Sequence, residues 1–299
     1  SGLPWGINSR TPGFVGIDTS PTKFGTQSFR FSSTAGITGN YAYWMILQTA
    51  NSSTSPDLVT INQYNWPNIK RGGNIDWSGD WTVEFWLYPT TLPTAGNSHG
   101  IFHVTSVDPD EGSHGLTMYA DASANIQFRW NNYRHTSDVV LGLNQSINSG
   151  TVLNTWNHVA LTRTASDGRI ILHWNGVAQL PAQIFTDVNV DALNTPGCTT
   201  FFGRFRSQYQ SGFSTVYDLE GGLEANIDDL RITQFARYNT DTFTVATEAY
   251  PITAPTPPTV DPDWSNVKLR LPFDTNLNDV SSYEETGTLT TGATAARFG

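Results

Sequence analysis

The sequence is poor in cysteine, in charge and in long apolar runs. Its 299 residues contain a single cysteine, Cys198, so no disulfide can form within the chain and the fold must rest on its core. Charged residues make up 14% and hydrophobic residues 38%, whereas disordered chains show the opposite balance. No apolar run is long enough to span a bilayer, so we expect no membrane insertion.

Positive charge is also scarce, because 16 Lys and Arg stand against 26 Asp and Glu, giving a net charge of -10. No basic patch is visible, which argues against nucleic acid as a partner. The chain begins Ser1-Gly2-Leu3 rather than with Met. We therefore expect it to be processed, trimmed of a tag, or cut from something longer.

What is abundant is typical of strands and tight turns. Aromatic residues reach 12%, with 10 Trp, and occur with many Thr, Ser, Asn and Gly. The length suits one large β-sandwich or two small domains. No segment of useful length repeats its apolar residues every 3.6 positions, so helices are not expected.

Alternation with a period of two is clearest between residues 74 and 250. In Trp81–Tyr88 every odd position is apolar, whereas the even positions hold Thr82, Glu84, Trp86 and Tyr88. This pattern predicts a strand with one core face and one mixed face, ended by Pro89.

Similar strands are predicted around 125–130, 158–162, 169–174 and 227–233. Asp167-Gly168 separates two of them and Asn175-Gly176 follows, and both pairs are hairpin signals. In the last segment Ile227, Asp229 and Arg231 alternate with Asp228 and Leu230, which predicts a half-buried strand. Many short strands with turns between them favour an all-β antiparallel sandwich.

Two segments differ from this pattern. Residues 36–73 are rich in Gly, Asn and Ser and read as a long inserted loop, whereas residues 251–262 form a Pro-rich linker. A further strand is predicted after the linker, with Val267, Leu269, Leu271 and Phe273 alternating with polar or cyclic residues.

Several of these motifs are familiar as a series. Trp81-Thr82-Val83-Glu84-Phe85-Trp86 resembles the central strand of laminin-G-like, concanavalin A-like domains, and so does 155–163 followed by Asn175-Gly176. The segment 227–233, with Ala236-Arg237-Tyr238-Asn239 and Phe243, completes the series. The resemblance covers residues 14–250 and implies a two-sheet antiparallel jelly-roll sandwich. The Ala-Arg-Tyr variant is most similar to copies in phage and environmental structural proteins.

The resemblance implies a non-enzymatic role, because members mostly bind glycans or proteins or act as structural modules of surfaces and virions. Related glucanases carry a Glu-x-Asp-x-x-Glu strand, since retaining hydrolysis needs two carboxylates about 5–5.5 Å apart. No such strand is present. Glu84 stands alone among aromatic residues, and Asp228 and Asp229, as neighbours, are expected on opposite faces.

The sequence departs from the family pattern at its ends. Lys23-Phe24-Gly25 precedes the strand at 27–31 as expected, but the opening strand before it is missing. Instead Val267-Lys268-Leu269-Arg270-Leu271 lies near the C-terminus and leads to Arg297-Phe298-Gly299. Two interpretations remain open. The chain is a fragment of a tandem array, or the tail supplies the missing strand to its own domain or to a neighbouring subunit.

Calcium is the one cofactor that the sequence leaves open. Asp108, Asp110 and Glu111 place three carboxylates in one short loop, although not with EF-hand spacing. A solvated acidic turn is the simpler interpretation. At Asp228 and Asp229 we favour a hydrogen bond to loop backbone over a metal ligand. His158 is expected to be packed and to donate to backbone.

Aromatic residues are the candidate ligand-binding groups. Trp86 and Tyr88 lie on the mixed face of their strand, and Trp and Tyr suit the apolar faces of sugar rings. In the alternative, this face packs under the inserted loop, which carries aromatic residues of its own. The candidate residues of that loop are Tyr41, Tyr43, Trp44, Tyr64 and Trp66.

Together these patterns predict a jelly-roll domain over residues 1–250, a linker over 251–262 and a strand-bearing tail over 263–299. The expected function is that of a structural or adhesion module of a virion or extracellular surface, self-associating through its C-terminal strand. The alternative is a lectin-like module that binds glycans, with or without calcium.

Overall fold

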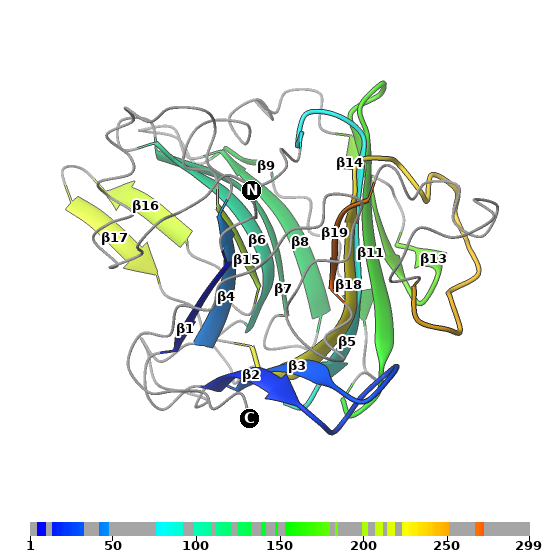
Figure 1. Ribbon diagram of the computed structural model, residues 1–299. Coiled ribbons are helices and arrows are strands. Elements are labelled where there is room, and N and C mark those ends of the chain that lie inside the picture. The colour runs from blue at the N-terminus through cyan, green and yellow to red at the C-terminus, as the bar shows by residue number, and fades with distance from the viewer. Residues whose placement is uncertain are drawn as a thin grey trace.

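The protein is a two-layer sandwich of antiparallel strands (Figure 1). The computed structural model describes residues 5–9, 14–32, 42–47, 76–91, 99–108, 112–120, 125–132, 139–141, 147–148, 153–179, 183–184, 199–202, 207–211, 214–218, 223–250 and 267–271. Every regular element in these ranges is a strand, which confirms the predicted all-β class.

The two large sheets contain eight and nine strands. The first runs in the order β1 (Trp5–Ser9), β4 (Ala42–Leu47), β15 (Thr199–Phe202), β6 (His99–Asp108), β7 (Gly112–Ala120), β8 (Asn125–Asn132) and β10 (Ile147–Asn148), with β9 (Val139–Leu141) also on β8. The second runs in the order β13 (Val177–Ala178), β12 (Arg169–Trp174), β11 (Asn157–Thr164), β5 (Trp81–Pro89), β18 (Ala225–Thr233), β3 (Ser28–Ser32) and β2 (Phe14–Asp18). Strand β14 (Gln183–Ile184) pairs with β12, β19 (Val267–Leu271) pairs with β18, and β16 (Ser207–Ser211) with β17 (Ser214–Asp218) forms a separate hairpin.

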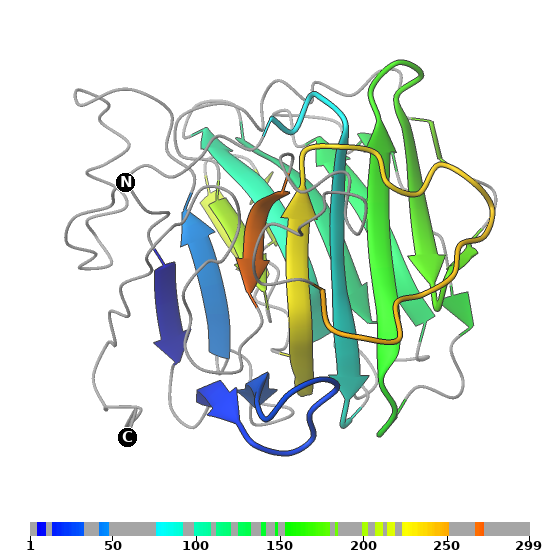
Figure 2. The ribbon, with the colours of Figure 1, turned by 45° about the vertical axis from the view of Figure 1, so that its right-hand side comes forward.

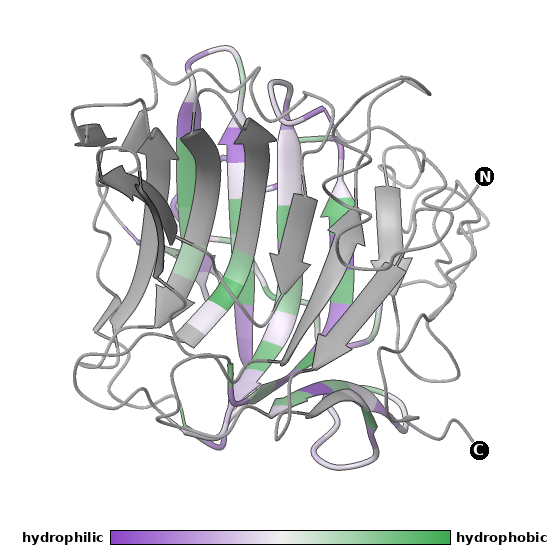
Figure 3. Ribbon diagram, turned by 90° about the vertical axis from the view of Figure 1, so that its left-hand side faces the viewer, coloured by the Kyte–Doolittle hydropathy of each residue, from purple (hydrophilic) through white to green (hydrophobic). Residues whose placement is uncertain are grey.

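The core lies between the two large sheets. On β5 the odd-numbered residues Trp81, Val83, Phe85 and Leu87 are all at most 1% exposed, as their alternation predicted. Trp77 just before β5 reaches across to Phe102 of β6, with ring centroids 6.4 Å apart. Apolar positions recur along the strands of the nine-stranded sheet, as the hydropathy colours show (Figure 3).

Both predicted hairpins are confirmed. Strands β11 and β12 pair on either side of the turn that contains Asp167-Gly168. Asn175 and Gly176 then join β12 to β13, with positive φ angles of 52° and 78°. A two-residue turn with φ positive at both positions matches the twist of the strands that it connects.

Strand β18 departs from the simple alternation that the sequence predicted. Asp228 pairs with Trp86 and Arg231 with Glu84, so two residues of β18 stand opposite Phe85 alone. This β-bulge, with φ of 54° at Asp229, shifts the alternation by one residue. Asp228 therefore shares the outer face of the sheet with Arg231, and all nine residues of β18 are buried rather than half of them.

Residues 234–250, called the strap below, explain that burial. They leave β18 and cross the outer face of the nine-stranded sheet, outside β5 and β11 (Figure 2). Backbone hydrogen bonds fasten the strap to the β12–β13 turn, from Ala178 N to Asp241 O at 2.7 Å and from Phe243 N to Gly176 O at 2.9 Å. Loop 19–27 covers another part of the same face.

Parts of the predicted insertion and tail belong to the sheets. Residues 42–47, expected within an inserted loop, form β4 between β1 and β15, so this part of the insertion is a strand of the sandwich. Residues 267–271 form β19, which lies against β18 of the same chain. The linker 251–262 lies outside the described residues.

Gly176 allows us to test how strongly the strap is held. A Cβ atom on this glycine would clash with Phe243 O, and its φ of 78° is unfavourable for other residues. We expect Gly176→Ala to lower the free energy of unfolding by about 2 kcal/mol or more, because either the turn or the strap must shift. Chemical denaturation measures this loss.

Gly168→Ala is the matched control, since Gly168 also has a positive φ, of 67°, but lies in the β11–β12 turn. An equal loss in both variants would contradict a specific role for contact with the strap.

Candidate functional site

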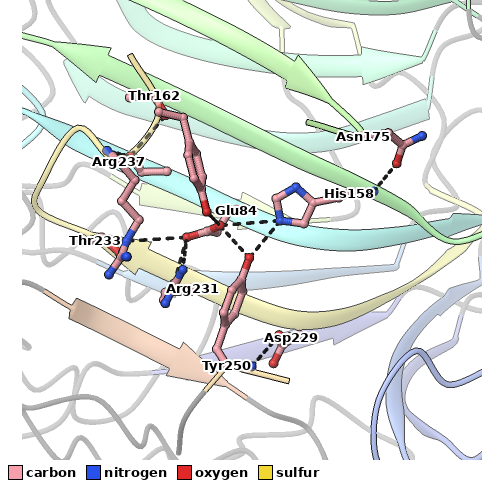
Figure 4. Close-up of polar contacts among 11 residues, drawn as sticks. Glu84, His158, Thr162, Asn175, Asp229, Arg231, Thr233, Arg237 and Tyr250 are labelled. Atoms are coloured by element: carbon pink, nitrogen blue, oxygen red, sulfur yellow. Dashed lines mark hydrogen bonds and ion pairs between the residues drawn. The ribbon is translucent and has the colours of Figure 1, made fainter. Parts of the chain in front are cut away.

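The most heavily bonded side chain on the outer face is Glu84 of β5, which is fully buried (Figure 4). Its Oε1 accepts a hydrogen bond from Nε of Arg231 of β18 at 2.8 Å and forms an ion pair with Nη2 of the same side chain at 2.7 Å. Its Oε2 accepts hydrogen bonds from Tyr238 and Tyr250, each at 2.7 Å. Both Arg231 nitrogens thus face one carboxylate oxygen, and charge-assisted contacts of this kind are about twice as strong as neutral hydrogen bonds.

Further groups close the network around these bonds. Arg237 of the strap lies with Nε 3.8 Å from Glu84 Oε1 and 3.0 Å from the Thr233 hydroxyl, to which it donates. The guanidinium of Arg231 lies 3.6 Å from the centre of the Tyr250 ring, which adds a cation–π contact. Two cations and two hydroxyls thus surround one carboxylate, and three of these four groups come from the strap.

The two buried histidines on this face serve the same network. His158 Nε2 lies 2.9 Å from the Tyr250 hydroxyl and 3.6 Å from Glu84 Oε2. The expectation of a packed His158 is correct, but its side-chain partner is a hydroxyl rather than backbone. His173 Nε2 lies 2.8 Å from Thr240 O of the strap, and burial lowers the pKa of His173. A neutral His173 that donates from Nε2 fits this contact.

The electrostatic environment keeps Glu84 deprotonated and keeps Tyr238 and Tyr250 protonated, as their hydrogen bonds require. Burial by itself raises the pKa of Glu84, but the charge of Arg231, the His158 hydrogen bond and Arg237 outweigh it and hold the pKa well below its usual range. Burial and the Glu84 charge raise the pKa of both Tyr238 and Tyr250. Glu84 therefore stays ionised, and both tyrosines remain donors.

Asp228 and Asp229 fix the ends of this covered face. Asp228 Oδ2 accepts from the backbone N–H of Lys23 at 2.9 Å and of Phe24 at 3.1 Å, which confirms the predicted bond to loop backbone. Asp229 Oδ2 accepts from Tyr250 N at 3.1 Å. The two carboxylates thus hold loop 19–27 and the end of the strap against β18.

Trp86 does not offer the free ring face that was predicted for it. It is 6% exposed, with His158 edge-on at 5.2 Å, Phe24 at 5.9 Å and Lys23 Nζ 3.7 Å from the ring centre. The prediction of an exposed stacking surface at Trp86 is therefore wrong. The covering residues come from loop 19–27, whereas the sequence had suggested residues 36–73.

Tyr88, unlike Trp86, keeps partial exposure. Its ring lies 5.2 Å from that of Trp156, tilted by 55°, and both side chains are half-buried. Trp156 is fixed by a hydrogen bond from Nε1 to Thr22 O at 3.1 Å. Tyr43 and Trp44 belong to β4, whereas Tyr41, Tyr64 and Trp66 lie outside the described residues.

The proposed metal loop stays a prediction. Asp108 is the last residue of β6, and Asp110 and Glu111 lie outside the described residues. Among the described residues, no three His, Cys, Asp or Glu side chains form a group that could hold a metal ion. Phe273 of the tail also lies outside the described part, whereas Val267, Leu269 and Leu271 belong to β19.

Sequence reasoning missed this network, and two features explain why. The sequence around Glu84 shows no partner for it, because its hydrogen-bonding partners lie 147 to 166 residues away along the chain. The bulge also places Arg231 on the outer face with Asp228, whereas simple alternation assigned it to the same face as Asp229. One signal was available, since a charged residue at the centre of an apolar strand needs a buried partner of opposite charge.

The match of a family model to residues 62–241 agrees with this architecture. The chain belongs to the concanavalin A-like lectin/glucanase superfamily. This result confirms the resemblance that the motifs indicated. A search of the curated proteins finds no match. Among the described residues no apolar helix has membrane-spanning length.

Solved structures resemble the chain at the level of fold. A heptameric SAP-like pentraxin from Limulus polyphemus is 18% identical, with TM-score 0.34, over 53% of this chain and 65% of its own. Tailspike protein 2 of an Escherichia coli O157:H7 bacteriophage is 11% identical, with TM-score 0.48, over 89% and 29%. The binding domain of botulinum neurotoxin serotype D is 16% identical, with TM-score 0.41, over 79% and 44%. The chain spans less than two thirds of each of these proteins.

The network predicts a specific response to loss of the Glu84 charge. We expect Glu84→Gln to lower the free energy of unfolding by about 3–5 kcal/mol at neutral pH, because it leaves Arg231 buried without its counter-ion. The pKa of Glu84 is depressed by folding, so its contribution is present above the unfolded value of about 4.3 and is lost as the pH falls below it. The difference between wild type and variant should therefore shrink in acid.

Denaturation of both proteins at neutral and at acidic pH measures this effect. Glu248→Gln is the control, since Glu248 is an exposed residue of the same strap and its replacement should change stability by less than about 0.5 kcal/mol. A pH-independent difference for Glu84→Gln would contradict a stabilising charge.

Proposed function

We propose that the protein is a non-enzymatic structural or adhesion module of a virion or extracellular surface, where copies assemble through the C-terminal strand. The observation that carries the proposal is that the chain's own residues cover the outer face of the nine-stranded sheet. Loop 19–27 and the strap cover it, and Trp86 and Glu84 lie beneath them.

The state of Glu84 supports a structural role over a catalytic one. General acid–base or nucleophilic catalysis needs a carboxyl group within reach of substrate. Glu84 is 0% exposed, and its two oxygens already accept three hydrogen bonds and make a further ion-pair contact with protein groups. Its depressed pKa also makes it a poor proton donor.

The position of the C-terminal strand supports assembly. A strand that follows a Pro-rich segment can complete the sheet of another copy through the same backbone hydrogen bonds. We expect the purified chain to self-associate as its concentration rises and to release no sugar from a panel of soluble and insoluble β-glucans.

Light scattering after size exclusion measures the mass, and a reducing-end assay measures hydrolysis, with heat-denatured protein as the blank. Turnover above the blank would overturn the non-enzymatic role. A mass of one chain at every concentration would overturn the role in assembly.

Carbohydrate binding is the second candidate, favoured by the half-buried ring pair of Tyr88 and Trp156. Neighbouring aromatic rings that keep one edge in water suit a sugar ring, which has apolar faces and polar rims. These rings lie beside loop 19–27 and away from the Glu84 network.

We expect any glycan found in a broad array screen, with and without calcium, to bind at least tenfold more weakly to Tyr88→Ala, a loss of about 1.4 kcal/mol. Phe235→Ala, at a 40% exposed aromatic residue of the strap, is the control. Equal binding by wild type and Tyr88→Ala would exclude this site.

A further inference from the structure

The edge of β18 opposite β5 is completed by two segments that lie far apart in the sequence. Ala225–Ile227 pair with β3, with Ala225 opposite Phe31 and Ile227 opposite Phe29. Beyond the bulge, Leu230–Thr233 pair with β19. Both partners run antiparallel to β18, so they lie one after the other along the same edge. The second half of this edge of β18 therefore depends on a strand from the tail.

The apolar positions of β19 match this place. Leu271 stands opposite Leu230 and Leu269 opposite Ile232, and both β18 residues are fully buried. Without β19, the backbone N–H and C=O groups that alternate residues of Leu230–Thr233 direct toward it would lose their partners beside the Glu84–Arg231 ion pair. An unpaired edge of this kind is a template for another strand. Among the named strands, β19 pairs with β18 alone.

The segment that leads to β19 is longer than the distance it has to span along β18. Tyr250 is fixed at Asp229, and Val267 pairs with Thr233, four residues further along β18. That separation is about 13 Å of strand. Residues 251–266 join the two points and are rich in proline. An extended Pro-rich segment of this length reaches about 50 Å. The surplus is enough to cross to an adjacent molecule.

We propose that β19 is an exchangeable strand, which also inserts beside β18 of a second copy of this chain. This proposal rests on the proposed function, because it names the contact through which copies assemble. The exchanged and closed forms contain the same β18–β19 ladder, so they differ only in the path of residues 251–266. The balance between them depends on concentration, since closure within one chain competes at an effective concentration of about 1 mM.

Disulfide trapping between two different variants tests the exchange directly. Ile232 and Leu269 stand opposite each other in the antiparallel ladder, and Cα atoms in such pairs lie about 4.5–5.5 Å apart, within disulfide range. In a Cys198→Ser background, one pool carries Ile232→Cys and the other carries Leu269→Cys. A disulfide between the pools forms only if β19 of one molecule lies on β18 of another. At total chain concentrations of about 1 mM, where exchange competes with closure within one chain, we expect a linked species of twice the chain mass under mild oxidation.

A matched pair controls for random collision and for unfolding. Val83 and Leu161 also stand opposite each other, on the adjacent central strands β5 and β11, and are equally buried. Pools with Val83→Cys and Leu161→Cys should give no linked species. If Ile232→Cys fails to fold, Thr233→Cys with Val267→Cys provides a second pair in the same ladder.

The outcomes separate this proposal from the proposed function. Linkage between the pools supports exchange. Linkage only within one molecule, when both cysteines are placed on the same chain, would overturn exchange even if the wild-type chain self-associates, and assembly would then use another surface. Linkage in the Val83 and Leu161 control as well would also overturn it, because unfolding would explain the result.

Discussion

The ionised carboxylate of Glu84, buried at the centre of a sheet, is the constraint on which this face of the molecule depends. A charge removed from water is costly unless it is paired and hydrogen-bonded. Strand β5 cannot supply those partners, so they come from β18 and from the strap. The strap must therefore lie in one register across the sheet, because a shift would separate Tyr238, Arg237 and Tyr250 from Glu84. An apolar cluster would cover the same area without selecting one arrangement so strictly.

The architecture could be predicted from the sequence because its signals are local. Alternation in Trp81–Tyr88 placed four residues in the core, and Asn175-Gly176 defined a turn whose positive φ angles suit that pair. The site could not be predicted in the same way, because its bonds join residues far apart in the chain. The bulge at Asp229 adds one residue to β18, and a rule of strict alternation then assigns Asp228 and Arg231 to opposite faces when they share one.

The exposure of Trp86 was also mispredicted because its covering residues lie far from it in the sequence. A strand with polar and aromatic residues on one face indicates that this face is not the apolar core, but it does not say whether water or protein covers it. Two short segments provide the cover here, and Asp228 holds one of them through the backbone of Lys23 and Phe24. Such bonds depend on the tertiary fold, and an acidic pair in a strand has the same sequence whether it binds backbone, metal or water.

Tyr250 joins the buried network to the tail, whose strand β19 pairs with β18 of its own chain or of a neighbouring copy. Its hydroxyl donates to Glu84, its ring lies under Arg231 and its backbone N–H donates to Asp229, so the chain leaves the sandwich from a fixed point. Everything before that point is the same whether β19 returns to its own β18 or pairs with that of a neighbour. The network thus keeps strand exchange from disturbing the strap, because the exchange alters the chain only after Tyr250. A fold with a weakly held strap would instead lose the cover over Trp86 and Glu84 whenever its tail moved.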